Sequence, residues 1–134
     1  MTRQPPDARI GRSPVAVLRQ DDYLIASVQS DLTDSEVLAL RDDLSRRIGR
    51  YRTRGIIIDV TALDVIDSFV ARALRSIAEA AKLRGATTVI VGIQPDVAIA
   101  MVHFNLDLEP LRTALDVDEA LTLLDRWTRG LERE

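Results

Sequence analysis

Two short apolar runs begin the patterned part of the chain, and both are of strand length. Residues 15–20 and 23–29 are rich in Val, Leu and Ile, and the polar pair Asp21-Asp22 separates them. Apolar runs on either side of two polar turn residues are typical of a β-hairpin. The pattern therefore predicts two antiparallel strands at the start of the fold.

Helical spacing of apolar residues follows in two later segments. The first begins at the capping box Thr33-Asp34-Ser35-Glu36, in which the Thr33 hydroxyl accepts from the Glu36 amide and the Glu36 carboxylate reaches back. This helix is expected to run to about Tyr51 on an apolar face of Val37, Leu40, Leu44 and Ile48. The second is expected at residues 68–84, with Gly85 at the C′ position and a face of Val70, Leu74, Ile77 and Ala81.

Continuous apolar runs mark the middle of the expected sheet. Residues 56–60 and 87–92 are rich in β-branched side chains, which indicates strands buried on both faces. The pattern then predicts an apolar helix over 95–105 and a short strand over 111–115. A last helix is expected to be capped by Asp116 or Asp118 and to end at Gly130. This alternation predicts a single α/β domain, a mixed and mostly parallel sheet covered by about four helices. We assign it to residues 15–130, with a disordered leader at 1–14 and a tail at 131–134.

Composition narrows the chemistry open to this domain. The 134 residues carry 18 Lys+Arg against 21 Asp+Glu, a formal net charge of −3, with no Cys and one His. Disulfides, thiolate nucleophiles and Cys-ligated zinc are excluded, and we expect no metal and no other cofactor. A mildly acidic chain lacks the basic surface that nucleic-acid binding requires. Because no signal-peptide core or membrane-spanning run is present, we expect a cytoplasmic protein that does not bind membranes.

The densest group of polar residues lies where the third expected strand leads into the second helix. Carboxylates and hydroxyls gather within ten residues there, and they include Asp59, Thr61, Asp64, Asp67 and Ser68. The first turn of a helix has unpaired amides and a partial positive charge, so a phosphate on Ser68 would be stabilised, with Arg72 one turn further on. The alternative is that Asp67 or Ser68 is simply the N-cap of the helix, a position that these residue types dominate.

Other interpretations of the polar residues have less support. Asp59 at the end of a predicted central strand resembles the phosphoacceptor of receiver domains, with Asp21-Asp22 in place of the acidic pair. The only lysine, Lys82, however, falls on a helix face that is predicted to be exposed. His103 sits in an apolar helix and has no partner that spacing can name. Arginines from Arg46 to Arg54 favour a solvated helix end over an anion site. An α/β enzyme would have to work with carboxylates and hydroxyls alone.

Three segments resemble a known family. Residues 57–69, 88–95 and 111–115 are similar to the STAS domains of the anti-sigma-factor antagonist group, and within it to the RsbS-like scaffold proteins of the bacterial stressosome. The resemblance covers residues 15–127. The Asp-Ser pair at the helix start is shared widely among STAS antagonists, whereas D-x-x-x-x-D-x-x-D-S-F and G-x-Q-P are more particular to the stressosome type.

The resemblance implies a protein that is phosphorylated by a serine kinase and is not itself an enzyme. It implies Ser68 as the phosphoacceptor, Asp67 as the acidic residue before it and Asp59 as the strand-end carboxylate. The rest of the switch loop and partner-binding surface would be Thr61, Asp64, Phe69 and Arg72. The implied partners are an RsbT-like switch serine/threonine kinase and an RsbR-like sensor co-antagonist, in homodimers and a large assembly.

A simpler antagonist that binds an anti-sigma kinase directly is the alternative within this family. In such antagonists a small pair of residues usually follows the serine, whereas Phe69-Val70 follows here. The difference favours the stressosome type.

Overall fold

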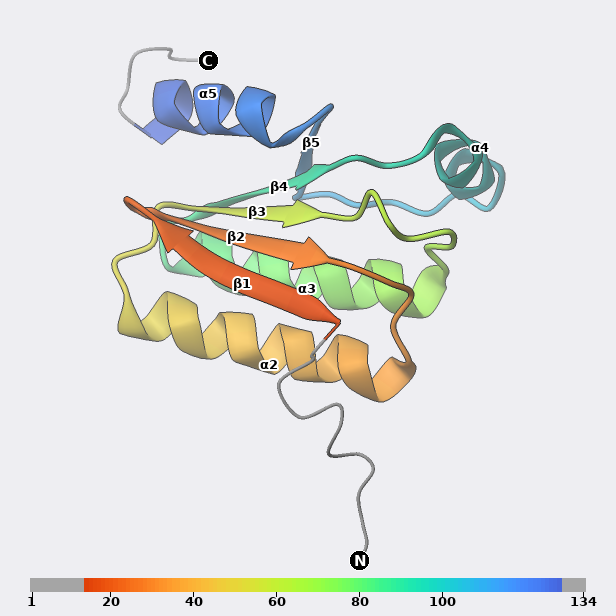
Figure 1. Cartoon of the computed structure of the whole chain (residues 1–134), viewed down its shortest axis with the longest axis horizontal. Coiled ribbons are helices and arrows are strands. Elements are labelled where there is room, and N and C mark those ends of the chain that lie inside the picture. Colours follow the sequence, from red (N-terminus) through yellow and green to blue (C-terminus); the bar gives the residue numbers. More distant parts are fainter. Residues whose placement is uncertain (1–13, 129–134) are drawn as a thin grey trace, which may run out of the picture.

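The computed structural model describes residues 14–128 as one α/β domain (Figure 1). The elements in chain order are β1 (Val15–Gln20), β2 (Tyr23–Val28), α2 (Asp34–Arg50), β3 (Gly55–Asp59), α3 (Ser68–Leu83), β4 (Thr87–Val91), α4 (Pro95–His103), β5 (Arg112–Ala114) and α5 (Val117–Thr128). The leader expected at 1–14, except Pro14, and the tail expected at 131–134 lie outside the described residues.

The five strands form one mixed sheet in the order β1-β2-β3-β4-β5. β1 is antiparallel to β2, and the remaining neighbours are parallel. Helices α2 and α3 cover one face of the sheet, α5 covers part of the other, and α4 lies beyond the end of the strands (Figure 1). The predicted fold class is therefore confirmed. No helix in residues 14–128 is long and apolar enough to cross a membrane.

The alternation of side chains along the strands divides the core in two. Ile56 and Ile58 face the layer of α2 and α3, while Ile57 faces α5. All three isoleucines are 0% exposed, as predicted for a strand buried on both faces. Each helix layer therefore packs against its own set of strand residues, and the central strand is held from both sides.

Most local signals appear in the structure as predicted. The Thr33 capping box forms in both directions, and Gly85 takes a φ of +84° directly after the helix end. The Asp116 carboxylate accepts from the Glu119 amide at 2.9 Å, which decides between the two expected caps of α5. The expected helix end at Gly130 lies outside the described residues. The elements begin and end within about two residues of their predicted bounds. The small differences arise because the ends of helices and strands fray and carry little sequence pattern.

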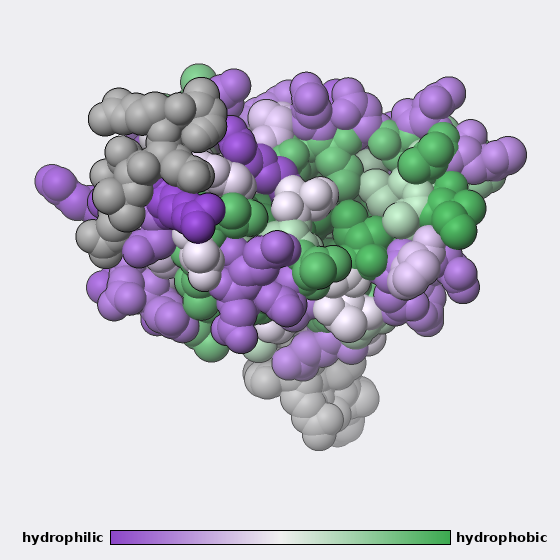
Figure 2. Space-filling view, turned by 90° about the horizontal axis from the view of Figure 1, so that it is seen from above, coloured by the Kyte–Doolittle hydropathy of each residue, from purple (hydrophilic) through white to green (hydrophobic). Residues whose placement is uncertain are grey.

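Helix α4 is shorter and less buried than its apolar sequence indicates. It ends at His103, and only Val97 and Met101 of its residues are buried. Ile99 and Val102 are 68% and 79% exposed, because the helix packs at the end of the sheet and offers one side to the core. Seen from above, apolar surface gathers between the middle of the molecule and the end that carries α4 (Figure 2). His103 is exposed, and its ring meets that of Phe104 edge-on.

Candidate functional site

The loop between β3 and α3 lies at the carboxyl ends of the parallel strands, where α/β folds place their functional residues. Asp59 ends β3, and Ser68 is the first residue of the 16-residue helix α3. Leu63 and Ile66 are 4% and 5% exposed and anchor the loop in the core. The polar residues between these anchors remain on the surface, so a rigid base presents them to solvent.

Asp67, and not Ser68, caps the helix. The Asp67 carboxylate accepts from the Val70 amide at 2.9 Å, and its own backbone is extended. Ser68 is exposed, and its hydroxyl has no hydrogen bond to any residue within 14–128. Because Asp67 fills the capping role, the serine hydroxyl is left available at the positive end of the helix dipole.

The Asp59 carboxylate shapes the loop. Its Oδ1 accepts from the Thr61 amide at 2.9 Å and from the Thr61 hydroxyl at 2.6 Å. Gly92, directly after β4, lies against this pair with a φ of +81°, and a Cβ added there would overlap the Thr61 hydroxyl. Close approach of the two strand ends therefore requires a glycine at this position.

The positions of the acidic pair and the lysine do not support phosphorylation of Asp59 as in receiver domains. Asp21-Asp22 immediately precedes β2, whereas Asp59 pairs with Ser27 near the other end of that strand. The acidic pair and Asp59 therefore lie at opposite ends of the strands. Lys82 lies near the other end of α3, about 21 Å along the helix from Ser68 at 1.5 Å per residue. The structure brings neither the acidic pair nor the lysine to Asp59.

Two side chains that the sequence analysis did not select hold the loop from outside. The Gln94 amide nitrogen donates to the Thr61 carbonyl at 2.7 Å and to the Leu63 carbonyl at 3.1 Å. Asp31, from the loop before α2, accepts from the Asp64 amide at 3.0 Å. The only signal for Gln94 was its place in the G-x-Q-P segment, and Asp31 gave none, since both contacts join residues about thirty positions apart.

The remaining predicted residues lie in the same loop and in the first two turns of α3. Asp64 and Asp67 are exposed in the loop. Phe69 is half-buried, and Arg72 is exposed one helical turn after Ser68. The Arg72 guanidinium makes no ion pair within residues 14–128. The site therefore combines a free hydroxyl, two carboxylates and one unpaired cation. No group of three or more His, Cys, Asp or Glu in the described part of the chain is arranged to hold a metal ion.

Replacing Gln94 by leucine is expected to loosen the loop and lower the free energy of unfolding by about 1–2 kcal/mol. The change keeps the approximate size of the side chain but removes the donor shared by two loop carbonyls. Urea unfolding measures the loss, and faster hydrogen exchange at the Thr61 and Leu63 amides would locate it. Gln20→Leu, at an exposed strand end, is the control. Equal losses in both variants would contradict the assigned role.

Comparison with known proteins matches residues 14–120 to the STAS domain model. The chain belongs to the STAS domain family. Among solved structures, this STAS domain is similar to a serine-to-glutamate variant of RsbS from Moorella thermoacetica, with 35% identity and a TM-score of 0.75 over 87% of this chain and 99% of that one. A chain from a structure of the molecular architecture of the stressosome is 33% identical, with a TM-score of 0.68 over 85% and 99% of the two chains.

A curated relative extends the similarity to longer proteins. RsbT co-antagonist protein RsbRA of Bacillus subtilis is 29% identical over 91 residues, which cover 65% of this chain and 33% of the relative. The match thus spans about a third of that relative's length. The predicted resemblance to the STAS antagonists, and among them to RsbS and stressosome proteins, is confirmed.

Proposed function

We propose that this STAS domain is a non-enzymatic scaffold of a bacterial stressosome that holds a switch serine/threonine kinase and is regulated by phosphorylation of Ser68. One observation carries the proposal. The Ser68 hydroxyl is exposed and has no hydrogen bond within residues 14–128, because Asp67 already caps the helix. A kinase can reach such a hydroxyl without unfolding the helix.

The chemistry of the site accounts for a change of binding without a change of fold. A phosphate adds about −1.5 to −2 charges at neutral pH, and the amides of the first helical turn and Arg72 stabilise it. The same charge lies beside the exposed carboxylates of Asp64 and Asp67. A partner docked on the unmodified loop would therefore meet a strongly acidic surface after phosphorylation, and would dissociate.

The names of the relatives support the identity of the partners. Similarity to RsbS and to a stressosome chain supports co-assembly with RsbR-like STAS proteins, and the RsbT co-antagonist relatives support an RsbT-like kinase as the captured partner. The proposal also includes homodimers of this chain and its incorporation into a large multi-protein assembly. Mixing the chain with an RsbR-like protein before size-exclusion chromatography separates this proposal from a free antagonist, which would elute without the co-antagonist.

The deciding experiment maps the phosphate. The full chain is incubated with the RsbT-like kinase of the source organism and Mg-ATP, then digested for mass spectrometry. We expect a phosphate ester at Ser68 that survives hydroxylamine, and an unmodified Ser76, which is exposed on the same helix. A hydroxylamine-labile phosphate on Asp59, or modification of Ser76 in place of Ser68, would overturn the assignment.

A further inference from the structure

Four arginines surround a cavity at the end of the sheet opposite Ser68. The cavity has a volume of about 700 Å³, and its walls come from the end of α2, the segment leading into β3, the end of α3 and the hairpin. Its charged lining residues are Arg50, Arg52, Arg54, Arg84 and Asp22. The ends of α2 and α3 and the segment leading into β3 therefore bring cations from separate parts of the chain into one hollow, and the hairpin contributes Asp22.

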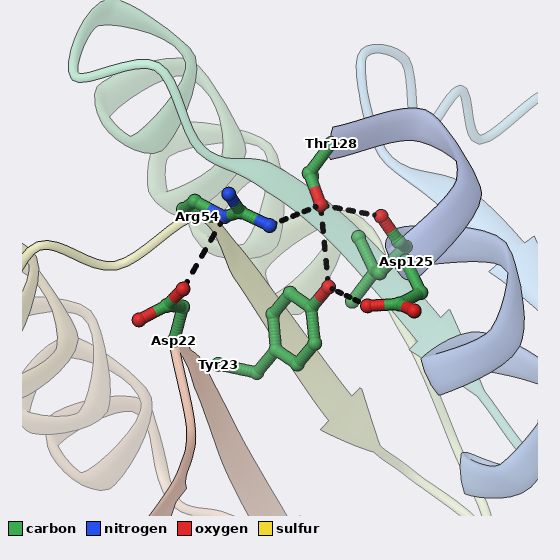
Figure 3. Close-up of polar contacts among 6 residues, drawn as sticks. Asp22, Tyr23, Arg54, Asp125 and Thr128 are labelled. Atoms are coloured by element: carbon green, nitrogen blue, oxygen red, sulfur yellow. Dashed lines mark hydrogen bonds and ion pairs between the residues drawn. The ribbon is translucent and has the colours of Figure 1, made fainter. Parts of the chain in front are cut away.

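Arg54 is the structural member of this group. Its Nε lies 3.5 Å from the Asp22 carboxylate, and its Nη2 donates to the Thr128 hydroxyl at 3.2 Å (Figure 3). The Tyr23 hydroxyl donates to Asp125 and also contacts Thr128, which completes the link from the hairpin to α5. Asp22 and Arg54 thus neutralise each other and hold the wall of the cavity in place.

The other three arginines are not neutralised. Arg50, Arg52 and Arg84 are exposed, and none of their guanidinium groups makes a hydrogen bond or ion pair to another residue in 14–128. Nearby arginines outside the cavity behave differently, because Arg46 and Arg47 both lie within ion-pair distance of Asp43. The arginines from Arg46 to Arg54, which the sequence predicts to be one solvated helix end, therefore form two groups. Some are paired on the surface of α2, and others line the cavity without an ion pair within residues 14–128.

Favourable interaction with the helix dipole explains only part of this arrangement. A cation in the last turn of a helix is stabilised by the dipole, and Arg50 has that position in α2. Arg52 lies beyond the end of α2, and Arg84 is the C-cap of α3. Three like charges around one cavity repel one another in a chain whose net charge is −3, and a bound anion would relieve that repulsion.

We infer that this cavity is a binding site for a small phosphate-bearing anion of at least two negative charges. Guanidinium groups form paired, charge-assisted hydrogen bonds with phosphate oxygens, and several of them around one hollow favour a compact multivalent anion over a monovalent one. The cavity volume lies within the range of small-molecule sites. Asp22 is already paired with Arg54, so it does not offset the three free cations.

Pyrophosphate is the probe for the first test, titrated into the full chain at constant ionic strength and followed by amide NMR. We expect saturable shifts of the Gly49 and Gly85 signals, since both glycines line the cavity. Gly92, at the Ser68 end of the sheet, should not move, which separates this site from anion binding at the start of α3. Shifts centred on Gly92, or shifts that never saturate, would overturn the inference.

Charge-matched variants give the second test. Arg52→Gln with Arg84→Gln is expected to weaken pyrophosphate binding by roughly tenfold or more in isothermal titration calorimetry. Arg46→Gln with Lys82→Gln removes the same charge from exposed positions that do not line the cavity, and should keep the affinity within about twofold. Equal losses in the two double variants would show only a general charge effect and would overturn the site. The inference would also be overturned if sulfate and chloride bound as tightly as pyrophosphate.

Discussion

Replacing Ser68 by glutamate is expected to weaken capture of the switch kinase by roughly tenfold or more while the domain stays folded. The substitution adds a carboxylate to the loop that already exposes those of Asp64 and Asp67, and the anchors of this loop in the core, Leu63 and Ile66, are buried. A docked partner would then have to desolvate or oppose three neighbouring acidic groups. Biolayer interferometry with the purified kinase measures the dissociation constant.

The fold should tolerate this change because a negative charge in the first turn of a helix interacts favourably with the dipole. We therefore expect the unfolding midpoint of Ser68→Glu to equal or exceed that of the wild type. Ser76→Glu adds the same charge at an exposed position two turns along α3 and should retain wild-type affinity. If Ser76→Glu lost as much affinity as Ser68→Glu, a general charge effect would replace the local mechanism. Unchanged binding by Ser68→Glu would contradict the switch itself.

Replacing Gly92 by alanine is expected to lower the free energy of unfolding by about 2–4 kcal/mol and to disorder the Asp59–Thr61 turn. Left-handed backbone costs a residue with a Cβ about 1–2 kcal/mol. The new Cβ would also overlap the Thr61 hydroxyl and lie 3.1 Å from the Asp59 carboxylate, so it would break the bonds that shape the loop. Urea unfolding gives the loss, and kinase capture should fall with it.

Gly85 provides a matched control. Its φ of +84° is nearly that of Gly92, but a Cβ there would meet nothing within 4 Å. Gly85→Ala should therefore show the cost of the backbone alone, and the difference between the two variants isolates the overlap at Thr61. In the Gly92→Ala background, Thr61→Ala should restore part of the stability, which a double-mutant cycle measures. Equal losses at both glycines would contradict the close approach of β4 to the loop.

The fold could be predicted well because its signals repeat along the chain. The apolar faces of α2 and α3, the isoleucines of β3 and the Thr33 capping box all depend on residues within one or two turns of each other. Helix α4 was the exception, because an apolar composition does not reveal whether a helix meets a sheet face or only its end. The exposure of Ile99 and Val102 depends on that placement.

The candidate site could be predicted only in its local part. The segment from Asp59 to Ser68 stood out by its polar residues and its place at a strand end. The contacts that hold it come from Asp31, Gln94 and Gly92, which belong to other connections in the fold. Gly92 and Gln94 stood out only as part of the G-x-Q-P segment and Asp31 did not stand out, because a single sequence does not show which distant residues meet.

By itself, the sequence determined the order of the elements, the buried strands, the helix start at Ser68 and a chain without cysteine chemistry, since each follows from neighbouring residues and their types. Only the structure decided that Asp67 caps α3, which leaves the Ser68 hydroxyl without a hydrogen bond within residues 14–128. It also decided that Arg84 joins Arg50 and Arg52 around one cavity. The physical reason is that parallel packing of βα units brings the ends of separate helices and loops together at the two edges of the sheet, and no local propensity encodes which residues meet there.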